Sequence, residues 1–400
     1  MLSFLSASAR VINSRRAIAE CFEIAGGAPE LECDLVIIHS GIGHDFGDLA
    51  SEAQRLAPGA KIVGASCCGV IGREGVSETM RDVAIMAVKG SELTAAHVDG
   101  ISGANSFEKA RELALEVKRT LPGVTMVYFM ASGIDIANDR CIDAIQEILG
   151  PEVTIFGATS SDNMRGLASY QIFGDQVFEH SAWLVGFADP SLEVVTGASH
   201  GFMAVGEPLW VTKASGNQII ELNGRPAWEE YTARLGLTMD ADCGQTIPIG
   251  ALAERLDEAQ AADYGNPHIL RVVTSFGEDQ ALHYATTIQE GTPLWLTVRD
   301  EERIFEDLDR MTAKIAEQGG ERRPVAVFHA DCLARGRHML DRILKEELIS
   351  RMQAPFLDGA EVPAWLGMYG FGEFARLLGR NEYHNYTSAL YVLYRRDSES

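Results

Sequence analysis

The chain lacks the short motifs that usually identify a metal or nucleotide site. It contains no C-x-x-C pair, no H-E-x-x-H and no Walker loop. It has no apolar run near the ~20 residues that a membrane helix needs, which argues against membrane insertion. Positive charge is also scarce, since 34 Lys and Arg face 57 Asp and Glu and leave a net charge of −23. Because such a field repels a phosphate backbone, we expect no nucleic-acid partner.

Cysteine usage points to a reducing compartment. The seven cysteines are an odd number in a chain of 400 residues and show no disulfide-like spacing. The first residues, MLSFLSASARVINSRRA, have no basic segment before their apolar part and make a poor signal peptide. We therefore expect reduced thiols and a cytoplasmic location, in a chain long enough for two or three domains.

An internal duplication is the most informative feature that is present. The tripeptide GAS at 64–66 returns as GAT at 157–159, and a strand, a helical pattern and further apolar runs surround both copies. The pattern appears a third time, with strands at 325–331, 364–370 and 388–395 and a helix over 336–352. Small residues at matching strand ends either leave room for a ligand between the units or let the backbones pack closely.

The patterns along the rest of the chain predict an α/β fold. Residues 194–222 have the short apolar runs of antiparallel strands, Pro226 begins a helix that ends near Gly236, and 237–267 is expected to be loop-rich. We predict mixed α/β sheets, with the duplicated strand-helix-strand-strand units forming two lobes. Helical spacing of apolar residues recurs over 14–25, 107–121, 138–149, where Asn138 is the expected N-cap, and 301–318.

One segment of the second half, Asp331-Cys332-x-x-Arg335, carries side chains suited to a small ligand. At a strand-to-helix junction the Arg335 guanidinium can grip a carboxylate in bidentate fashion. Cys332 at a helix N-terminus would have a lowered pKa and would be reactive. A small core cysteine and a surface arginine explain the same residues equally well.

A second segment runs from Tyr369 to Asn385. Residues 370–375 fit G-x-G-x-x-A, but Glu373 would face a pyrophosphate there, so we interpret it as a carboxylate kept for a cation or an amine. His384 is a candidate ligand of a metal or haem. A solvated glutamate and a structural histidine are the plain alternatives. The predicted ligand site comprises Ser66, Cys332, Arg335, Tyr369, Glu373, His384 and Asn385.

These motifs resemble those of the FIST family of sensory proteins. The resemblance runs from about 33 to 395 and departs from the family at His329, Met368, Phe371 and the Cys67-Cys68 pair. It implies an N-terminal helical lead-in (1–32), a FIST N-type domain (33–225), a FIST C-type domain (226–395) and a tail (396–400). The motifs that carry it are His-Gly, Val-Thr-Lys, Glu-Leu-x-Gly and Pro-Ala within 200–231, GASCCGVIG (64–72), FGATSSD (156–162), FHADCLARG (328–336), GMYGFGEFARLLG (367–379) and YHNYT (383–387).

The resemblance also implies a function. FIST proteins are thought to bind small ligands such as amino acids and to signal to kinases or cyclic-di-nucleotide enzymes. A stand-alone chain would pass its signal to a separate protein, such as a histidine kinase, and would hold an amino acid's carboxylate on Arg335 and its amine on Glu373. Chains of this length also resemble haem-binding nitric-oxide sensors, in which His384, or else Cys332 or His329, would ligate haem b. An enzyme with Cys332 as nucleophile and His384 or His329 as base is a third hypothesis, and the oligomeric state stays open.

Overall fold

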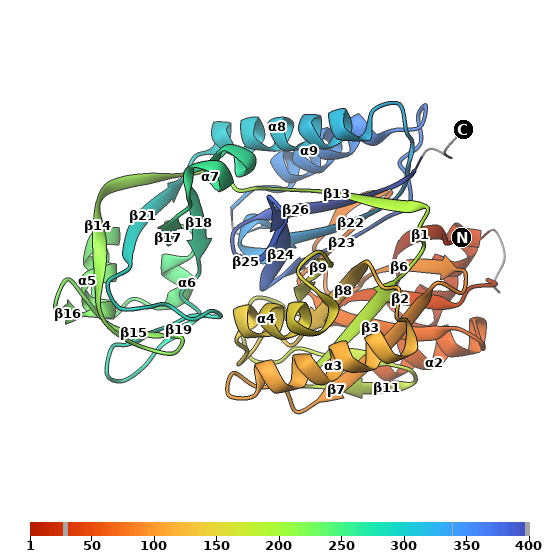
Figure 1. The fold of residues 1–400 in the computed structure, drawn as a ribbon, viewed down its shortest axis with the longest axis horizontal. Helices are drawn as coiled ribbons and strands as arrows, with labels where there is room; N and C mark the ends of the chain where they lie inside the picture. The colour runs from red at the N-terminus through yellow and green to blue at the C-terminus, as the bar shows by residue number, and fades with distance from the viewer. Residues whose placement is uncertain (27–30, 338, 397–400) are drawn as a thin grey trace.

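The computed structural model describes residues 1–26, 31–337 and 339–396, which form three six-stranded sheets and one eight-stranded sheet. Figure 1 shows a large body built on the three six-stranded sheets and a smaller lobe beside it. This arrangement confirms the predicted mixed α/β class with two lobes. All three copies of the repeated unit lie in the large body, and none of them forms the smaller lobe.

The first two units follow the same order of elements. In each, an antiparallel outer strand pairs with the last strand of the unit, and the two inner strands run parallel through a crossover helix. The first unit comprises β1 (Ser3–Arg10), α1 (Ser14–Gly26), β2 (Leu35–Gly41), α2 (Phe46–Leu56), β3 (Lys61–Cys67), β4 (Val70–Gly72), β5 (Gly75–Ser77) and β6 (Asp82–Lys89). The second comprises β7 (Leu93–Asp99), α3 (Ser106–Thr120), β8 (Met126–Ala131), α4 (Asn138–Leu149), β9 (Thr154–Thr159), β10 (Gln171–Phe173), β11 (Gln176–Phe178) and β12 (Ser181–Phe187).

The third unit repeats this order but is interrupted after its first strand. Its parallel pair is β22–β23, and α8 and α9 lie over its sheet (Figure 1). The unit comprises β13 (Leu192–Ser199), α8 (Glu301–Gly319), β22 (Pro324–Cys332), the 3₁₀ turn η1 (Leu333–Arg335), α9 (Arg342–Gln353), the 3₁₀ turn η2 (Ala354–Phe356), β23 (Trp365–Gly370), β24 (Gly372–Leu377), β25 (Arg380–His384) and β26 (Ser388–Arg395).

The interruption is the smaller lobe, residues 202–299, inserted between β13 and α8. Its own core packs Trp228 and Tyr231 against the lobe's strands. It comprises β14 (Phe202–Ser215), β15 (Gln218–Leu222), β16 (Arg225–Pro226), α5 (Ala227–Leu235), α6 (Cys243–Thr246), β17 (Gly250–Arg255), α7 (Glu258–Tyr264), β18 (His268–Arg271), β19 (Ser275–Phe276), β20 (Leu282–His283) and β21 (Pro293–Arg299).

The three units exchange hairpins in a cycle. The β10–β11 hairpin of the second unit extends the sheet of the first, and the β24–β25 hairpin of the third extends that of the second. The β4–β5 hairpin of the first unit closes the cycle on the sheet of the third. Because each sheet needs strands from two units, the units cannot bury their edges alone and fold as one body. The cycle also brings the ends of β3, β9 and β23 together.

The elements differ from the predicted ones in a few places. Residues 1–32 contain β1 besides α1, because the Ser-Ala alternation of 3–10 pairs with β6 although it lacks strong strand formers. The predicted loop 237–267 contains β17, and the helix expected over 336–352 begins only at Arg342. Ala137, not Asn138, is the N-cap of α4. Residues 397–400 of the predicted tail lie outside the described residues. No helix within the described ranges is long and apolar enough to cross a membrane.

Candidate functional site

The candidate site lies where the carboxyl ends of β3, β9 and β23 meet. Backbone hydrogen bonds join the three strand ends: Cys68 N donates to Tyr369 O (3.0 Å), Ser161 N to Ser66 O (3.0 Å) and Phe371 N to Thr159 O (3.2 Å). A Cβ on Gly370 would lie 2.6 Å from the Thr159 carbonyl oxygen, so this approach requires glycine. The small residues noted in the sequence therefore serve close packing of the backbones here.

Arg335 is buried, and two of its N–H groups already donate to acceptors of the protein. Its side chain is 1% exposed, its Nε donates to Asp331 Oδ1 (2.9 Å), and its Nη1 donates to the His200 carbonyl oxygen (3.0 Å). Arg335 Nη2 has no hydrogen-bond partner among the described residues. The 3₁₀ turn η1 places the guanidinium back over Asp331, four positions earlier. One edge of a buried guanidinium is thus left for a further acceptor.

Glu373 and Cys332 lie side by side in the same buried region. Glu373 Oε2 accepts from Thr387 N (3.3 Å), and the Cys332 thiol is a hydrogen-bonding neighbour of the same carboxyl group. Oε1 has no N–H or O–H donor within the described chain. Burial, with Asp331 adding to it, raises the pKa of Glu373 well above its usual value. Burial also raises the pKa of Cys332 well above that of a free thiol, with Glu373 adding to it, so the predicted lowered pKa of Cys332 is wrong. An apolar shell and two carboxyl groups oppose thiolate formation there.

His384 stands opposite Glu373 in the β24–β25 ladder and is fully buried. Neither ring nitrogen has a partner in the part of the chain that the structure describes, and the Tyr264 ring packs edge-on against it at 5.5 Å. Burial lowers the pKa of His384 to about 3, so the imidazole is neutral. The Tyr369 hydroxyl is likewise buried without a partner. We call the six residues Asp331, Cys332, Arg335, Tyr369, Glu373 and His384 the central cluster.

The two remaining predicted site residues have structural contacts. Asn385 accepts from Val272 N of the smaller lobe (3.2 Å) and donates to Phe371 O (3.3 Å), so it joins the lobe to the body. The Ser66 hydroxyl accepts from Tyr170 N (2.9 Å) and holds the loop before β10. Ser66 is linked to the central cluster through Ser161, whose hydroxyl donates to Tyr369 O (2.8 Å).

A haem does not fit the cavity next to the predicted ligand His384. A cavity of about 550 Å³, which we call the interlobe cavity, is lined by residues of α4, β25, β17 and β18, and none of its lining residues is a histidine or cysteine. His384 follows one of these residues, but its ring is enclosed by protein. Across residues 1–26, 31–337 and 339–396 no group of three or more His, Cys, Asp or Glu side chains is placed to hold a metal ion.

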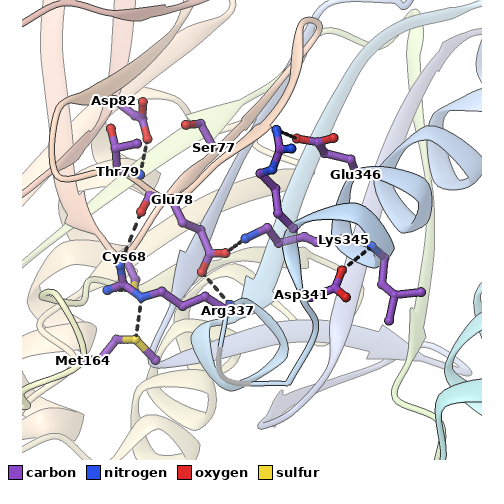
Figure 2. Close-up of polar contacts among 12 residues, drawn as sticks. Cys68, Ser77, Glu78, Thr79, Asp82, Met164, Arg337, Asp341, Lys345 and Glu346 are labelled. Atoms are coloured by element: carbon purple, nitrogen blue, oxygen red, sulfur yellow. Dashed lines mark hydrogen bonds and ion pairs between the residues drawn. The ribbon is translucent and has the colours of Figure 1, made fainter.

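Figure 2 shows a second polar group, built around Glu78 and Lys345, two residues that sequence patterns did not single out. Glu78, in the loop before β6, forms an ion pair with Lys345 of α9, and Glu78 Oε1 accepts from Arg337 N (3.0 Å). The Arg337 guanidinium contacts Met164 Sδ (3.0 Å) and Cys68 Sγ (3.8 Å). These contacts join all three units. In the sequence, the spacing of Arg335 and Arg337 is the signal that could have pointed to these contacts.

Comparison with known proteins identifies two domains. Residues 34–225 match the FIST N domain and residues 227–376 match the FIST C domain. An uncharacterized protein of Mycobacterium tuberculosis is 24% identical over 393 residues, covering 94% of this chain and 95% of the relative. An uncharacterized protein of Mycobacterium bovis is 27% identical over 218 residues, 52% of each chain. The crystal structure of cyanuric acid hydrolase from A. caulinodans aligns over the full length of both chains with 10% identity and a TM-score of 0.34, which is too low to carry an argument.

Proposed function

The chain belongs to the FIST family, whose domains act in sensing and signal transduction, and we propose that it binds a small amino-acid-like ligand at the central cluster. Arg335 holds the ligand's carboxylate and Glu373 holds its amine. The bound protein then regulates a separate signalling protein, such as a histidine kinase or a cyclic-di-nucleotide enzyme, in the cytoplasm. Seven free cysteines are compatible with that compartment.

The observation that carries the proposal is a pair of buried, unpaired groups of opposite kind. Among the described residues, Arg335 Nη2 offers N–H donors without an acceptor, and Glu373 Oε1 offers an acceptor without an N–H or O–H donor. An unpaired buried polar group costs about 1–3 kcal/mol, so a ligand that supplies both partners regains that cost. An amino acid presents a carboxylate and an ammonium group a few bonds apart. A bound ammonium would also favour the ionised form of Glu373.

The position of the cluster supports a sensory role. Arg335 Nη1 holds the carbonyl of His200, which lies between β13 and the first strand of the smaller lobe. Asn385, next to His384, holds the backbone of Val272 inside that lobe. A ligand that draws on Arg335 or on β25 therefore acts on two of the contacts between body and lobe. A ligand shifts the equilibrium between two positions of the smaller lobe if it binds one position more tightly than the other. Such a difference in affinity is enough for signalling.

The test is a thermal-shift and calorimetric screen of the standard amino acids with the full chain. A ligand at 100 times its Kd should stabilise the protein by about 2.7 kcal/mol. Glu373→Gln and Arg335→Gln should each weaken binding at least tenfold. Glu108→Gln, an exposed glutamate of α3, is the matched control and should bind as the wild type does. Unchanged affinity in both cluster variants would refute the assignment of the ligand to this cluster.

The partner and the haem alternative have their own measurements. Adding the protein to purified histidine kinases of its own organism should change their autophosphorylation, and that change should depend on the ligand. An absorption spectrum of protein from cells supplied with haem precursor, before and after nitric oxide, should lack a Soret band. A Soret band that shifts with the gas would replace the amino-acid proposal by a haem-based sensor.

A further inference from the structure

The interlobe cavity lies apart from the central cluster and has the polar lining of a binding site. Its volume of about 550 Å³ falls within the range of small-molecule sites. One wall comes from the body, through α4 and β25, and the other from the smaller lobe, through β17, α7 and β18. In Figure 1 the lobe stands beside the ends of α4 and β25. A molecule that fills this cavity touches both parts.

One region of the lining has unused hydrogen-bond acceptors. Asp139, in the first turn of α4, accepts from Thr287 N (3.2 Å) through Oδ2, but its buried Oδ1 has no partner among the described residues. Thr286 also lines the cavity, is 5% exposed, and has a buried hydroxyl oxygen without a partner among the described residues. A buried carboxylate oxygen without a donor is costly and calls for an N–H group. An ammonium group of a ligand supplies one.

Two other lining residues offer unpaired cations. Arg255 at the end of β17 and Arg380 at the start of β25 form no ion pair with any residue that the structure describes, and they stand on opposite walls. By contrast, Arg271 is already engaged, with Nε on Glu254 Oε1 (2.6 Å) and Nη1 on Tyr383 O (2.8 Å). Free guanidinium groups recognise carboxylates, commonly in bidentate fashion. An anionic group can therefore be held from both walls.

The lining as a whole selects for a molecule that carries both charges. Its three arginines face four carboxylates, so a polyanion meets repulsion from the acids and a polycation meets repulsion from the arginines. The carboxylates are Asp139, Asp143, Glu254 and Glu382. A single amino acid leaves much of the volume empty, whereas a dipeptide spans more of it and separates its amine from its carboxylate.

We propose that the interlobe cavity is a second ligand site, which takes a dipolar molecule of dipeptide size with its carboxylate at Arg255 and Arg380 and its amine at Asp139. Such a ligand bridges the two walls and fixes the position of the smaller lobe. The cavity and the central cluster share no residue, although Tyr383 of the cavity directly precedes His384 of the cluster, and their ligands are tested with separate variants. Either site can therefore fail its test without the other.

Isothermal titration calorimetry of the full chain with L-alanyl-L-alanine and a panel of neutral dipeptides tests this site. Succinate and 1,4-diaminobutane serve as probes with one kind of charge. We expect a dipeptide to bind, the Arg255→Gln/Arg380→Gln variant to lose at least tenfold in affinity, and Asp139→Asn to lose a similar factor. Arg16→Gln, an exposed arginine of α1, is the control for loss of positive charge and should bind normally.

Three results would overturn the proposal for the cavity itself, and a fourth would move the dipeptide to the central cluster. The first is the absence of binding for every dipeptide at millimolar concentration. The second is equal affinity for succinate or 1,4-diaminobutane, which would assign a different ligand class. The third is full affinity in both cavity variants. Glu373→Gln must leave dipeptide binding intact, because a loss there would place the dipeptide in the central cluster instead.

Discussion

Removing one partner of the buried Lys345–Glu78 ion pair should destabilise the protein strongly. The two side chains are 8% and 4% exposed, and Glu78 is the carboxylate that forms an ion pair with the Lys345 ammonium. Burial lowers the pKa of Lys345. Lys345→Met keeps the length of the side chain but leaves the Glu78 carboxylate, among the described residues, with the Arg337 backbone N–H as its donor. Breaking a buried pair in this way costs about 3–5 kcal/mol.

A double-mutant cycle separates the pair from its surroundings. Glu78→Gln should also destabilise, and Lys345→Met/Glu78→Gln should cost at least ~2 kcal/mol less than the sum of the single variants, because no unpaired charge remains. The assay is urea denaturation followed by tryptophan fluorescence and far-UV circular dichroism. The matched control is the surface pair of Arg119 and Glu116, 71% and 46% exposed, where Arg119→Met should cost less than about 1 kcal/mol.

The result that refutes this reasoning is a Lys345→Met variant no less stable than Arg119→Met. It would mean that the ion pair of Figure 2 opens to water in solution. The contacts of Glu78 and Lys345 would then not hold the three units together. Additive effects in the cycle would likewise show that Glu78 and Lys345 do not interact.

Three further predictions concern pH, backbone and thiols. Burial lowers the pKa of His39 to about 4 and that of His200 and His384 to about 3, so below pH 6.5 the unfolded state binds protons that the native state does not. The free energy of unfolding should therefore be lower at pH 5 than at pH 7 by about 2 kcal/mol per histidine, which a lower urea midpoint would show. The raised pKa of Glu373 opposes this loss in part, because native Glu373 binds a proton that the unfolded state releases. Gly157→Ala should cost more than ~2 kcal/mol in the same assay, because φ is +127° and the new Cβ would lie 2.0 Å from Phe129 O, whereas Gly166→Ala, with φ +63° and open space, should cost about 1 kcal/mol. Iodoacetamide at pH 8 should label the half-buried Cys33 before Cys332, as read by peptide mass spectrometry, and rapid labelling of Cys332 would contradict the closed central cluster.

Much of the body could be predicted from the order of residues. The GAS and GAT tripeptides occupy the same register in β3 and β9, since each pairs in parallel with the preceding strand of its unit. The third copy was visible because its strands and its helix keep the apolar periods of 2 and 3.6. The sequence patterns failed where strand pairing outweighs intrinsic strand propensity. In β1, serines and alanines form a strand because they pair with β6.

For the candidate site, the sequence identified chemical types and the fold decided their state. Cys332, Arg335 and Glu373 were predicted as neighbours and do lie together. Asp331 is only four positions from Arg335, but the His200 carbonyl that accepts from Arg335 Nη1 is 135 positions away. The burial that raises the pKa of Cys332 likewise comes from distant segments. The dielectric around a buried side chain and the hydrogen-bond partners that it finds depend on how the surrounding residues pack, so a local sequence motif does not predict them.

By itself the sequence determined the α/β class, the threefold repetition, the family and the residue types at the strand ends, because these rest on local periodicity and composition. The hairpin cycle, the Lys345–Glu78 pair and the interlobe cavity were decided only by tertiary structure. The cavity draws its walls from residues 139–151, 254–271, 286–287 and 379–383. These segments meet because the smaller lobe is inserted between β13 and α8. The chain must return from the lobe to the sheet that contains β13 and β22, so the lobe folds back against the body.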